Sequence, residues 1–384
     1  MRGLEIRPTR LPEDCTRLRA EVRTFLREQL DAGTFVPSVD AWLTGWDPAF
    51  SRSLGERGWL GLTVPVQYGG HGATALQRYV VIEELLAAGA PVAAHWIADR
   101  QVAPALLAHG TEEQKHRYLP AIARGECFFA LGMSEPDAGS DLAAVRTRAE
   151  RTEHGWRVTG QKVWTSGAHH AHAILFLART SPVGEGSRHS GMSQFLCDLP
   201  ADGVAVNPIR LMSGAHHFNE VVFDNVALAP EDLLGVQGQG WAQVTAELAY
   251  ERSGPERLLS TFPLLAALAR NHDGLPLGDA HHALLGELTA RVWALRQLSL
   301  GVAGALSRGE RPDSAAALVK DLGTTLEQDV VEAVLDVVEP AGLPEESELR
   351  RMLLHAALQS PGFTLRGGTN EILRGVVARS LGMR

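Results

Sequence analysis

The spacing of apolar residues along the chain changes twice, and each change indicates a different type of secondary structure. From about Pro12 to Ala123 the apolar positions recur with the period of a helix. From about Cys127 to Gly235 short runs alternate with the period of a strand, and from Gly240 onward long amphipathic helical segments return. We therefore predict a mostly α-helical chain with a β domain in its middle.

The first region contains clear signals for helix boundaries. Thr111 followed by Gln114 matches a capping box, in which each side chain binds the backbone N–H of the other residue. This pair predicts a helix that begins at residue 112. Residues 75–88 read as a second helix, and the Gly- and Pro-rich stretch 63–72 predicts a connection.

The middle region contains several short runs rich in β-branched and aromatic residues, with turn signals between them. They are Trp156–Thr159, Ala173–Ala178, Ser193–Cys197, Val204–Asn207 and Phe218–Phe223. Such a series predicts an antiparallel sandwich or barrel. Residues 182–190, which contain Gly, Ser and Pro, predict an exposed loop.

The last region predicts a four-helix bundle, because four amphipathic segments follow one another. They cover about 241–270, 279–307, 313–338 and the stretch from about 345. Gly254 and Pro255 predict a kink in the first segment, because proline removes a helical hydrogen bond. The predicted domains are 1–126, 127–238 and 239–384.

Composition narrows the class of protein. A chain of 384 residues predicts two or three packed units. Its 36 Lys and Arg against 45 Asp and Glu give a net charge of −9 without a basic block, which argues against a nucleic-acid partner. The sequence predicts neither a signal peptide nor a membrane-spanning stretch, so we expect a cytoplasmic protein that does not enter membranes.

Cysteine and histidine spacing argues against disulfides and metals. The three cysteines, at 15, 127 and 197, are isolated and match no Cys-x-x-Cys motif, which fits a reducing compartment. The histidines form pairs such as His169-His170 and His216-His217, but none shows a His-Glu-x-x-His spacing. We therefore expect no metal site.

The stretch from 128 to 166 is the most informative for chemistry. Its loop Met133–Asp141 offers hydroxyls and backbone N–H groups, stiffened by Pro136 and opened by Gly139. Trp164-Thr165-Ser166 follows a hairpin and adds a flat ring with two hydroxyls. Together they suit a planar heterocycle that is stacked on one face and hydrogen-bonded along one edge. Composition alone also fits an ordinary turn and a core tryptophan.

The order of these motifs resembles that of the acyl-CoA dehydrogenases, a family of flavoenzymes. The strings MSEPDAGSD and GWRVTGQKVWTSGA resemble the family signature, and the likeness extends from Gly58 to the C-terminal Gly367-Gly368-Thr369-Asn370-Glu371. The resemblance implies an N-terminal helical domain, a β-barrel or sandwich, and a C-terminal four-helix bundle. It also implies FAD and the α,β-dehydrogenation of an acyl-CoA thioester, with hydride passing from the β-carbon to flavin N5.

The catalytic base departs from the commonest family pattern. Many members carry a Glu directly before the C-terminal Gly-Thr, where this chain has Gly367. Another branch, which includes isovaleryl and long-chain dehydrogenases, takes the Glu from a Leu-x-x-Glu-Arg sequence in the first bundle helix. This chain has Leu248-Ala249-Tyr250-Glu251-Arg252. Glu251 is therefore the candidate base and Arg252 the residue that orients it; without the resemblance, each would read as an exposed helix charge.

The resemblance assigns further roles position by position. Leu131, Met133 and Ser134 match the loop along the isoalloxazine ring, and Trp164 and Ser166 match the residues on its opposite side. The remaining matches are Thr369 and Glu371 near the ribityl chain, Ser140 at the pantetheine arm, and the Gly367 N–H as a donor to the thioester oxygen. The missing side chain at Gly367 is consistent with a branched or polycyclic acyl group.

A second departure concerns assembly. The family usually binds the FAD diphosphate from a neighbouring subunit, and here Arg270 is kept but Asp273 replaces an aromatic residue. Around residues 338–343 the Gln- and Gly-rich motif is missing. This pattern resembles the α2β2 acyl-CoA dehydrogenases of actinobacterial steroid side-chain breakdown, so we expect a homologous companion chain, with a homo-oligomer as the alternative.

The resemblance also implies an electron-transfer flavoprotein as the electron acceptor. Two other functions remain open from the sequence. One is a non-catalytic or half-site partner subunit, which would not be yellow when purified. The other is a flavin-dependent oxidase or monooxygenase, which would consume oxygen without an added acceptor.

Overall fold

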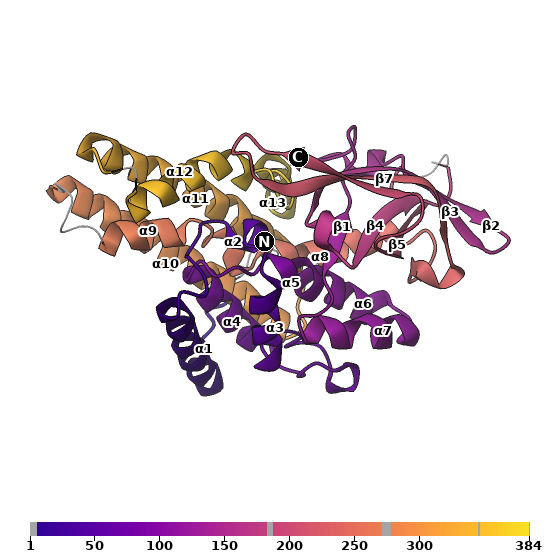
Figure 1. Ribbon diagram of the computed structural model, residues 1–384, viewed down its shortest axis with the longest axis horizontal. Helices are drawn as coiled ribbons and strands as arrows, with labels where there is room; N and C mark the ends of the chain where they lie inside the picture. The colour runs from indigo at the N-terminus through magenta and orange to yellow at the C-terminus, as the bar shows by residue number, and fades with distance from the viewer. Residues whose placement is uncertain (1–5, 183–186, 271–277, 345, 384) are drawn as a thin grey trace. The chain divides into compact units, whose positions relative to one another are not determined.

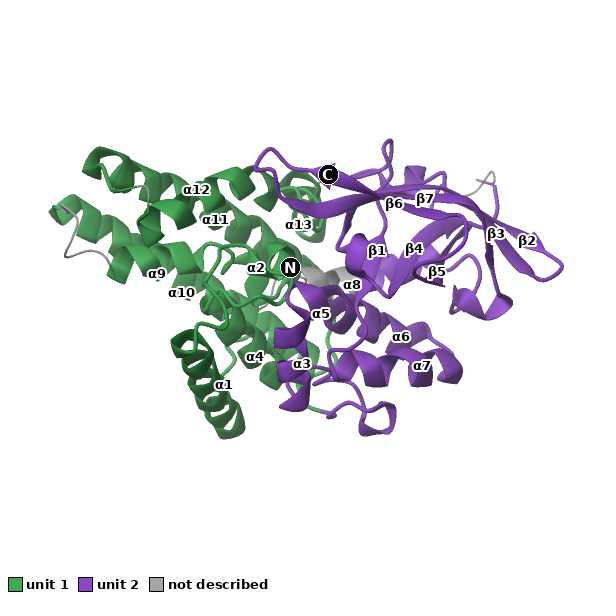
Figure 2. Ribbon diagram, in the orientation of Figure 1, with its two compact units in different colours: residues 1–46, 73–92, 249–384 green, residues 47–72, 93–248 purple. Residues whose placement is uncertain are grey.

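The computed structural model describes residues 6–182, 187–270, 278–344 and 346–383, and for residues 247–251 it describes the backbone alone. The chain forms two compact units, coloured separately in Figure 2. Unit 1 comprises Met1–Trp46, Ala73–Val92 and Ala249–Arg384, and unit 2 comprises Asp47–Gly72 and Ala93–Leu248. The division into three domains stays a prediction.

The β domain that the sequence predicts lies in unit 2. Its strands are β1 (Phe129–Gly132), β2 (Arg148–Thr152), β3 (Gly155–Ser166), β4 (Ala173–Arg179), β5 (Met192–Asp198), β6 (Val204–Arg210), β7 (His216–Leu228) and β8 (Leu233–Leu234). They join in one sheet in the order β6-β7-β3-β2-β4-β5-β8, with β1 beside β4 (Figure 1). Most neighbours are antiparallel, but β1 runs parallel to β4, and β2 meets β4 in a parallel pair at one position.

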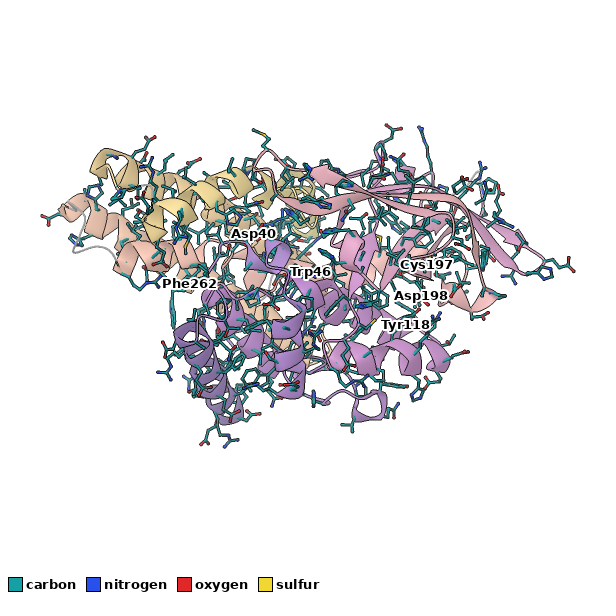
Figure 3. All side chains as sticks on the ribbon, viewed as in Figure 1. Asp40, Trp46, Tyr118, Cys197, Asp198 and Phe262 are labelled. Atoms are coloured by element: carbon teal, nitrogen blue, oxygen red, sulfur yellow. The ribbon has the colours of Figure 1, made fainter. Side chains whose placement is uncertain are left out.

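The helices of unit 2 precede this sheet in the chain. They are α3 (Pro48–Glu56), α5 (Ala93–Ile97), α6 (Ala103–His109) and α7 (Glu112–Ala123), with the short turns η2 (Val66–Tyr68) and η3 (Ala98–Val102). Thr111 and Gln114 form the predicted capping box, since Thr111 Oγ1 accepts from Gln114 N at 3.2 Å and Gln114 Oε1 accepts from Thr111 N at 3.0 Å. At the other end of α7, Tyr118 Oη donates to Asp198 Oδ1 of β5 at 2.8 Å (Figure 3).

Strand β4 separates two cores because consecutive side chains of a strand point to opposite faces. Leu175 belongs to a core with Leu106 of α6, whereas its neighbours Ile174 and Phe176 belong to a second core. In that second core Phe176 stacks on Phe223 of β7 with ring centroids 4.5 Å apart. One core is thus built mainly from side chains of the sheet's own strands, and the other lies between the sheet and the helices of unit 2.

The predicted bundle lies in unit 1. Its helices are α1 (Glu13–Asp31), α2 (Ala41–Thr44), α4 (Ala75–Ala87), α9 (Phe262–Arg270), α10 (Asp279–Ser307), α11 (Asp313–Ala341), α12 (Glu348–Phe363) and α13 (Asn370–Ser380). The N-terminal segment crosses α10 closely at two glycines. A Cβ at Gly301 would lie 2.4 Å from Ile6 Cγ2, and one at Gly304 would lie 2.2 Å from Thr9 Oγ1.

The first bundle segment differs from its prediction. We expected a kinked helix over 241–270, but α8 (Gly240–Arg252) ends before Gly254, the turn η7 (Pro255–Arg257) follows, and α9 begins at Phe262. The missing N–H of Pro255 and the steric clash of its ring explain why the chain breaks instead of bending. The break leaves Glu251 and Arg252 at the C-terminal end of a helix.

Candidate active site

The loop that follows β1 begins at a tightly packed glycine. A Cβ at Gly132 would lie 3.0 Å from Phe176 Cβ and 3.2 Å from Lys162 Cγ, so the close approach of β1 favours glycine. Leu131, Met133 and Ser134, the predicted flavin-facing residues, lie at this point and are all partly exposed. Among the described residues, nothing forms a hydrogen bond with the Ser134 hydroxyl, which leaves it available to a ligand.

A buried ion pair lies beneath this loop and was not predicted. Lys162 of β3 is fully buried, and its Nζ lies 2.7 Å from Glu135 Oε1 and 3.2 Å from Met133 O. The Glu135 carboxylate also accepts from Arg146 N at 2.6 Å and from Thr147 N at 3.0 Å. The pair therefore fixes the loop on both sides of Ser134.

The charges of this pair follow from its surroundings. Burial lowers the pKa of Lys162 to about 8, and Glu135 opposes that change. For Glu135, burial would raise the pKa, but Lys162 and the N–H donors of Arg146 and Thr147 bring it below its usual value. Both groups are consequently charged at neutral pH. The alternation of side chains along β3 could have predicted that Lys162 is buried. Lys162 is an even number of positions from the buried Trp156 and Val158, and such residues of a strand share a face.

Trp164 is held in a strained conformation beside the same loop. Its φ of +58° is left-handed, at a register shift between Lys162 and Thr165 of β3. The preceding residue connects it to the loop, because Val163 N donates to Ser134 O at 2.9 Å. The indole is 55% exposed and meets Phe218 edge-on at 5.7 Å. A left-handed tryptophan costs roughly 1–3 kcal/mol, and such strain is typical of ligand sites.

The end of β3 is fixed by the side chains of Asn219 and His169. Asn219 Nδ2 lies 3.0 Å from Thr165 O and 3.0 Å from His169 Nδ1. Burial lowers the pKa of His169 to about 4, with further contributions from His170 and His216. His169 is therefore neutral at pH 7 and can accept the Asn219 N–H. Ser166, the adjacent predicted residue, remains partly exposed.

The arrangement in unit 2 fits a flavin ring. An exposed indole, the free hydroxyl of Ser134 and the partly exposed Ser166 lie at neighbouring ends of β1 and β3. These groups offer one stacking surface and hydrogen bonds to an edge, which is the donor set that an isoalloxazine needs. Ser140 lies farther along the same loop and is exposed.

A second group of predicted residues comes together in unit 1. Arg252 Nε donates to Gly367 O at 3.1 Å, and a Cβ at Gly368 would lie 3.1 Å from Arg252 Nη2. Gly367 and Gly368 have φ values of +67° and +90°, so this turn favours glycine at both positions. Glu251 precedes Arg252 in the last turn of α8, but its side chain lies outside the described part of the chain.

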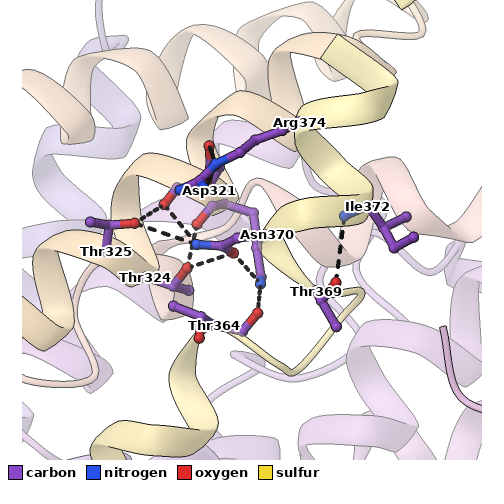
Figure 4. A network of polar contacts seen from close by, with 9 residues as sticks. Asp321, Thr324, Thr325, Thr364, Thr369, Asn370, Ile372 and Arg374 are labelled. Carbon is purple, nitrogen blue, oxygen red and sulfur yellow. Dashed lines mark hydrogen bonds and ion pairs between the residues drawn. The ribbon is translucent and has the colours of Figure 1, made fainter. Parts of the chain in front are cut away.

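Thr369 and Glu371 lie where that turn leads into α13. Thr369 is the N-cap, and its hydroxyl accepts from Ile372 N at 3.4 Å (Figure 4). The Glu371 side chain is exposed, and its pKa is lowered by its own backbone N–H and by the Thr369 hydroxyl. Both residues thus have structural explanations at a helix N-terminus, which do not conflict with the predicted contacts to a ribityl chain.

Arg270 is occupied by a local ion pair. Its Nη2 lies 3.3 Å from Glu348 Oε1, and the Arg270 side chain is 57% exposed. Asp273 lies outside the described residues. Near the missing Gln- and Gly-rich motif, α11 ends at Ala341, Gly342 is left-handed and Glu339 is exposed.

The described residues contain neither a candidate metal cluster nor a candidate membrane span. In the described ranges, no group of three or more His, Cys, Asp or Glu could hold a metal ion. Likewise, no helix in the part of the chain that the structure covers is both long and apolar enough to span a membrane.

Comparison with known proteins identifies the family. Three family models match: the acyl-CoA dehydrogenase N-terminal domain over residues 12–126, its middle domain over 130–226 and its C-terminal domain over 263–382. Acyl-CoA dehydrogenase FadE29 of Mycobacterium tuberculosis is 35% identical over 344 residues, which are 86% of this chain and 87% of the relative.

Solved structures agree over almost the whole chain. The Tcur3481-Tcur3483 steroid ACAD has a TM-score of 0.86 and 30% identity, covering 98% of this chain and 99% of its own. The ChsE4-ChsE5 complex from Mycobacterium tuberculosis has a TM-score of 0.82 and 28% identity, covering 98% and 100%. The chain therefore belongs to the acyl-CoA dehydrogenase family of flavoprotein oxidoreductases, as the sequence motifs predicted.

Proposed function

We propose that this chain catalyses the FAD-dependent α,β-dehydrogenation of an acyl-CoA thioester, with Glu251 as the base. The hydrogen bond from Arg252 Nε to Gly367 O, at 3.1 Å, is the observation that carries the proposal. It ties the residue after Glu251 to the loop that supplies the base in many members of the family. A carboxylate on α8 would therefore act at the position that Gly367 leaves without a side chain.

The reaction needs a carboxylate because an α C–H is a poor acid. Gly367 and Gly368 cannot supply one, and Glu251 is adjacent to the anchored Arg252. The positive charge of Arg252 favours the ionised form of a neighbouring carboxylate. In this proposal Glu251 takes the α-proton and Arg252 orients the end of α8.

The developing negative charge on the thioester oxygen also needs a donor. The Gly367 N–H is the proposed donor, and Arg252 restrains the conformation of Gly367 through its carbonyl. Since a donor placed in advance spends no energy on reorganisation during the reaction, such a restraint supports catalysis directly.

The residues of unit 2 would hold the isoalloxazine ring of the cofactor. When bound, FAD supplies the two-electron acceptor, flavin N5, for the β-hydrogen. The exposed ring of Trp164 would stack on the isoalloxazine, and the free Ser134 hydroxyl would donate to its N5/O4 edge. Leu131, Met133 and Ser166 would line the ring, and Thr369 and Glu371 would approach the ribityl chain.

The proposed substrate is a CoA thioester with a bulky acyl group. Gly367 frees the volume that a glutamate side chain fills in many relatives, and the exposed Ser140 would contact the pantetheine arm. A solved relative is described as a steroid acyl-CoA dehydrogenase. We therefore propose a polycyclic, steroid-type or otherwise branched acyl group, with an electron-transfer flavoprotein as the acceptor.

The proposed assembly pairs this chain with a homologous companion. Arg270, the remaining residue of the diphosphate clamp, is bound to Glu348, and the Gln- and Gly-rich motif is missing. The ChsE4-ChsE5 relative is itself described as a complex. This chain would supply the base and the flavin-facing loops, and the companion would supply the diphosphate clamp.

Anaerobic titration with a panel of acyl-CoAs tests the proposed function. The panel contains steroid-type, branched and straight-chain thioesters, and visible flavin absorbance reports reduction. We expect a bulky acyl-CoA to bleach the flavin and to yield an enoyl-CoA that has lost two hydrogens. Flavin that is bleached by dithionite but by no thioester of the panel would contradict the proposal.

A further inference from the structure

Helix α11 carries a buried lysine directly beneath the turn that contains Gly367. Lys320 is fully buried, and its Nζ lies 2.8 Å from Thr364 O and 2.7 Å from Asn370 Oδ1. Thr364 is the C-cap of α12, and Asn370 is the first residue of α13. One ammonium group thus binds both ends of the turn.

Burying the Lys320 side chain costs free energy, so the groups that compensate its charge must be identified. Burial, together with repulsion from Arg257 and Arg366, lowers the pKa of Lys320 to about 7, although Asp321 and Glu327 oppose the change. Among the described residues, no carboxylate lies within ion-pairing distance of Nζ. An ammonium in such surroundings costs several kcal/mol unless polar groups compensate it. The compensation comes from the Thr364 carbonyl, at the negative end of α12, and from the Asn370 amide.

Contacts to groups outside the turn hold its shape. Gly367 and Gly368 have no side chains to pack, and both adopt left-handed φ values. Asn370 N closes the turn by donating to Thr364 O at 3.1 Å. Beyond that bond, Arg366 within the turn forms an ion pair with the buried Asp40 at 2.7 Å. Arg252 binds Gly367 O, and Lys320 binds the two ends of the turn.

Asn370 is also fixed by other groups of α11, as Figure 4 shows. Its Nδ2 lies 3.3 Å from Asp321 O and 3.4 Å from Thr325 Oγ1. Thr324 Oγ1 lies 3.2 Å from Asn370 Oδ1. This network orients the Asn370 amide oxygen toward Lys320, so the hydrogen bond from Lys320 has a defined geometry.

We propose that Lys320 is a positioning residue, which holds Thr364 and Asn370 so that the Gly367 N–H stays aligned with the thioester oxygen. The alignment rests on the proposed function, whereas the restraint of the turn does not. A displacement of about 1 Å at a reacting centre can slow a reaction by about a hundredfold. Loss of the restraint should therefore affect the chemical step more than substrate affinity.

The experiment compares Lys320→Met and Thr324→Val with the control Val330→Ala in the flavin-loaded enzyme. Met keeps the length of lysine but donates no hydrogen bond. Thr324→Val removes the hydroxyl that lies 2.8 Å from Lys320 O and 3.2 Å from Asn370 Oδ1, and it leaves the Lys320 ammonium in place. Val330 is buried on the same helix, so Val330→Ala destabilises the bundle through a cavity. Hydrogen–deuterium exchange follows residues 364–370, and anaerobic stopped flow gives the limiting rate of flavin reduction and the substrate Kd.

Lys320→Met should raise exchange in residues 364–370 and lower the limiting rate by about tenfold or more, with Kd changed less than about threefold. Thr324→Val should also raise exchange in residues 364–370 and lower the limiting rate of flavin reduction, but by smaller amounts. If Lys320→Met does not fold, Thr324→Val provides the test. Exchange and rates like those of Val330→Ala would overturn the proposal. Faster exchange in an enzyme that no acyl-CoA reduces would instead uphold the restraint and refute the proposed function.

Discussion

Glu327 shows how strongly this fold perturbs a single buried carboxyl group. The side chain is fully buried on α11, and its Oε1 accepts from Ser260 N at 2.8 Å. Among the described residues, Oε2 has no hydrogen-bond partner. Burial raises the pKa of Glu327 to about 7, although the positive charge of Arg366 acts to lower it. The folded protein therefore binds a proton here that the unfolded chain releases at lower pH.

The stability of Glu327→Gln relative to the parent should consequently depend on pH. Between the unfolded pKa, about 4.5, and the folded pKa, about 7, the folded parent holds more protons, so its stability falls as pH rises. Glu327→Gln does not lose stability in this way, because its amide does not titrate. Its unfolding free energy relative to the parent should rise by up to about 3 kcal/mol across that window and then level off.

Denaturant unfolding at several pH values measures this difference. The control is Glu332→Gln, which removes an exposed carboxylate from the same helix. A Glu327→Gln difference that stays flat from pH 4.5 to 7 would show that this carboxyl group is not perturbed by burial.

The turn between α12 and α13 and the loop after β1 are each held by a lysine from a neighbouring element. Lys162 reaches from β3 to Glu135, and Lys320 reaches from α11 to Asn370. Both segments carry proposed site residues. Each lysine restrains its segment through hydrogen bonds to a backbone carbonyl and to a side chain of that segment.

A double-mutant cycle should expose the coupling between Lys162 and Glu135. Lys162→Met leaves a buried carboxylate without its cation and should cost about 3–5 kcal/mol of unfolding free energy. Adding Glu135→Gln removes that charge, so the double variant should recover part of the loss. Arg117→Met, which breaks a half-exposed pair with Asp198, should cost less than about 1 kcal/mol. Additive effects of the Lys162 and Glu135 substitutions would contradict the coupling.

Local signals in the sequence predicted most elements, and long-range contacts decided the remainder. The Thr111–Gln114 capping box and the helix over 279–307 follow from neighbours in the chain. The parallel pairing of β1 with β4 does not, because the paired residues, such as Phe129 and Ala173, lie 44 positions apart in the sequence. The predicted kink became a break because the sequence marks Pro255 but not the packing of the segments that flank it.

The candidate site shows the same limit. Motifs singled out Ser134, Trp164 and Arg252 through their resemblance to the family. Lys162 and Lys320 were missed because a lysine in a strand or helix usually reads as exposed, and what makes these two informative is burial. Their partners lie 27 and 50 positions away in the sequence, a separation that no local pattern records.

At the scale of the whole molecule, the proposed diphosphate clamp comes from a second, homologous chain. The proposed flavin-facing groups are present, but Arg270 is bound to Glu348 and the expected clamp motif is missing. Expressed alone, the chain should therefore purify with well under one FAD per chain. Co-expression with its homologous companion should give a yellow α2β2 complex, measurable by native mass spectrometry and flavin absorbance. A homotetramer of this chain saturated with FAD would contradict the claim.

The central claim is that Glu251 removes the α-proton, and its most direct test is single-turnover flavin reduction by Glu251→Gln. The control Glu287→Gln removes an exposed carboxylate from α10. At equal FAD content and saturating acyl-CoA, Glu251→Gln should reduce its flavin slower by a factor of about 10²–10⁴, the usual contribution of a general base, while Glu287→Gln matches the parent. A Glu251→Gln enzyme that is reduced as fast as the control would contradict the account.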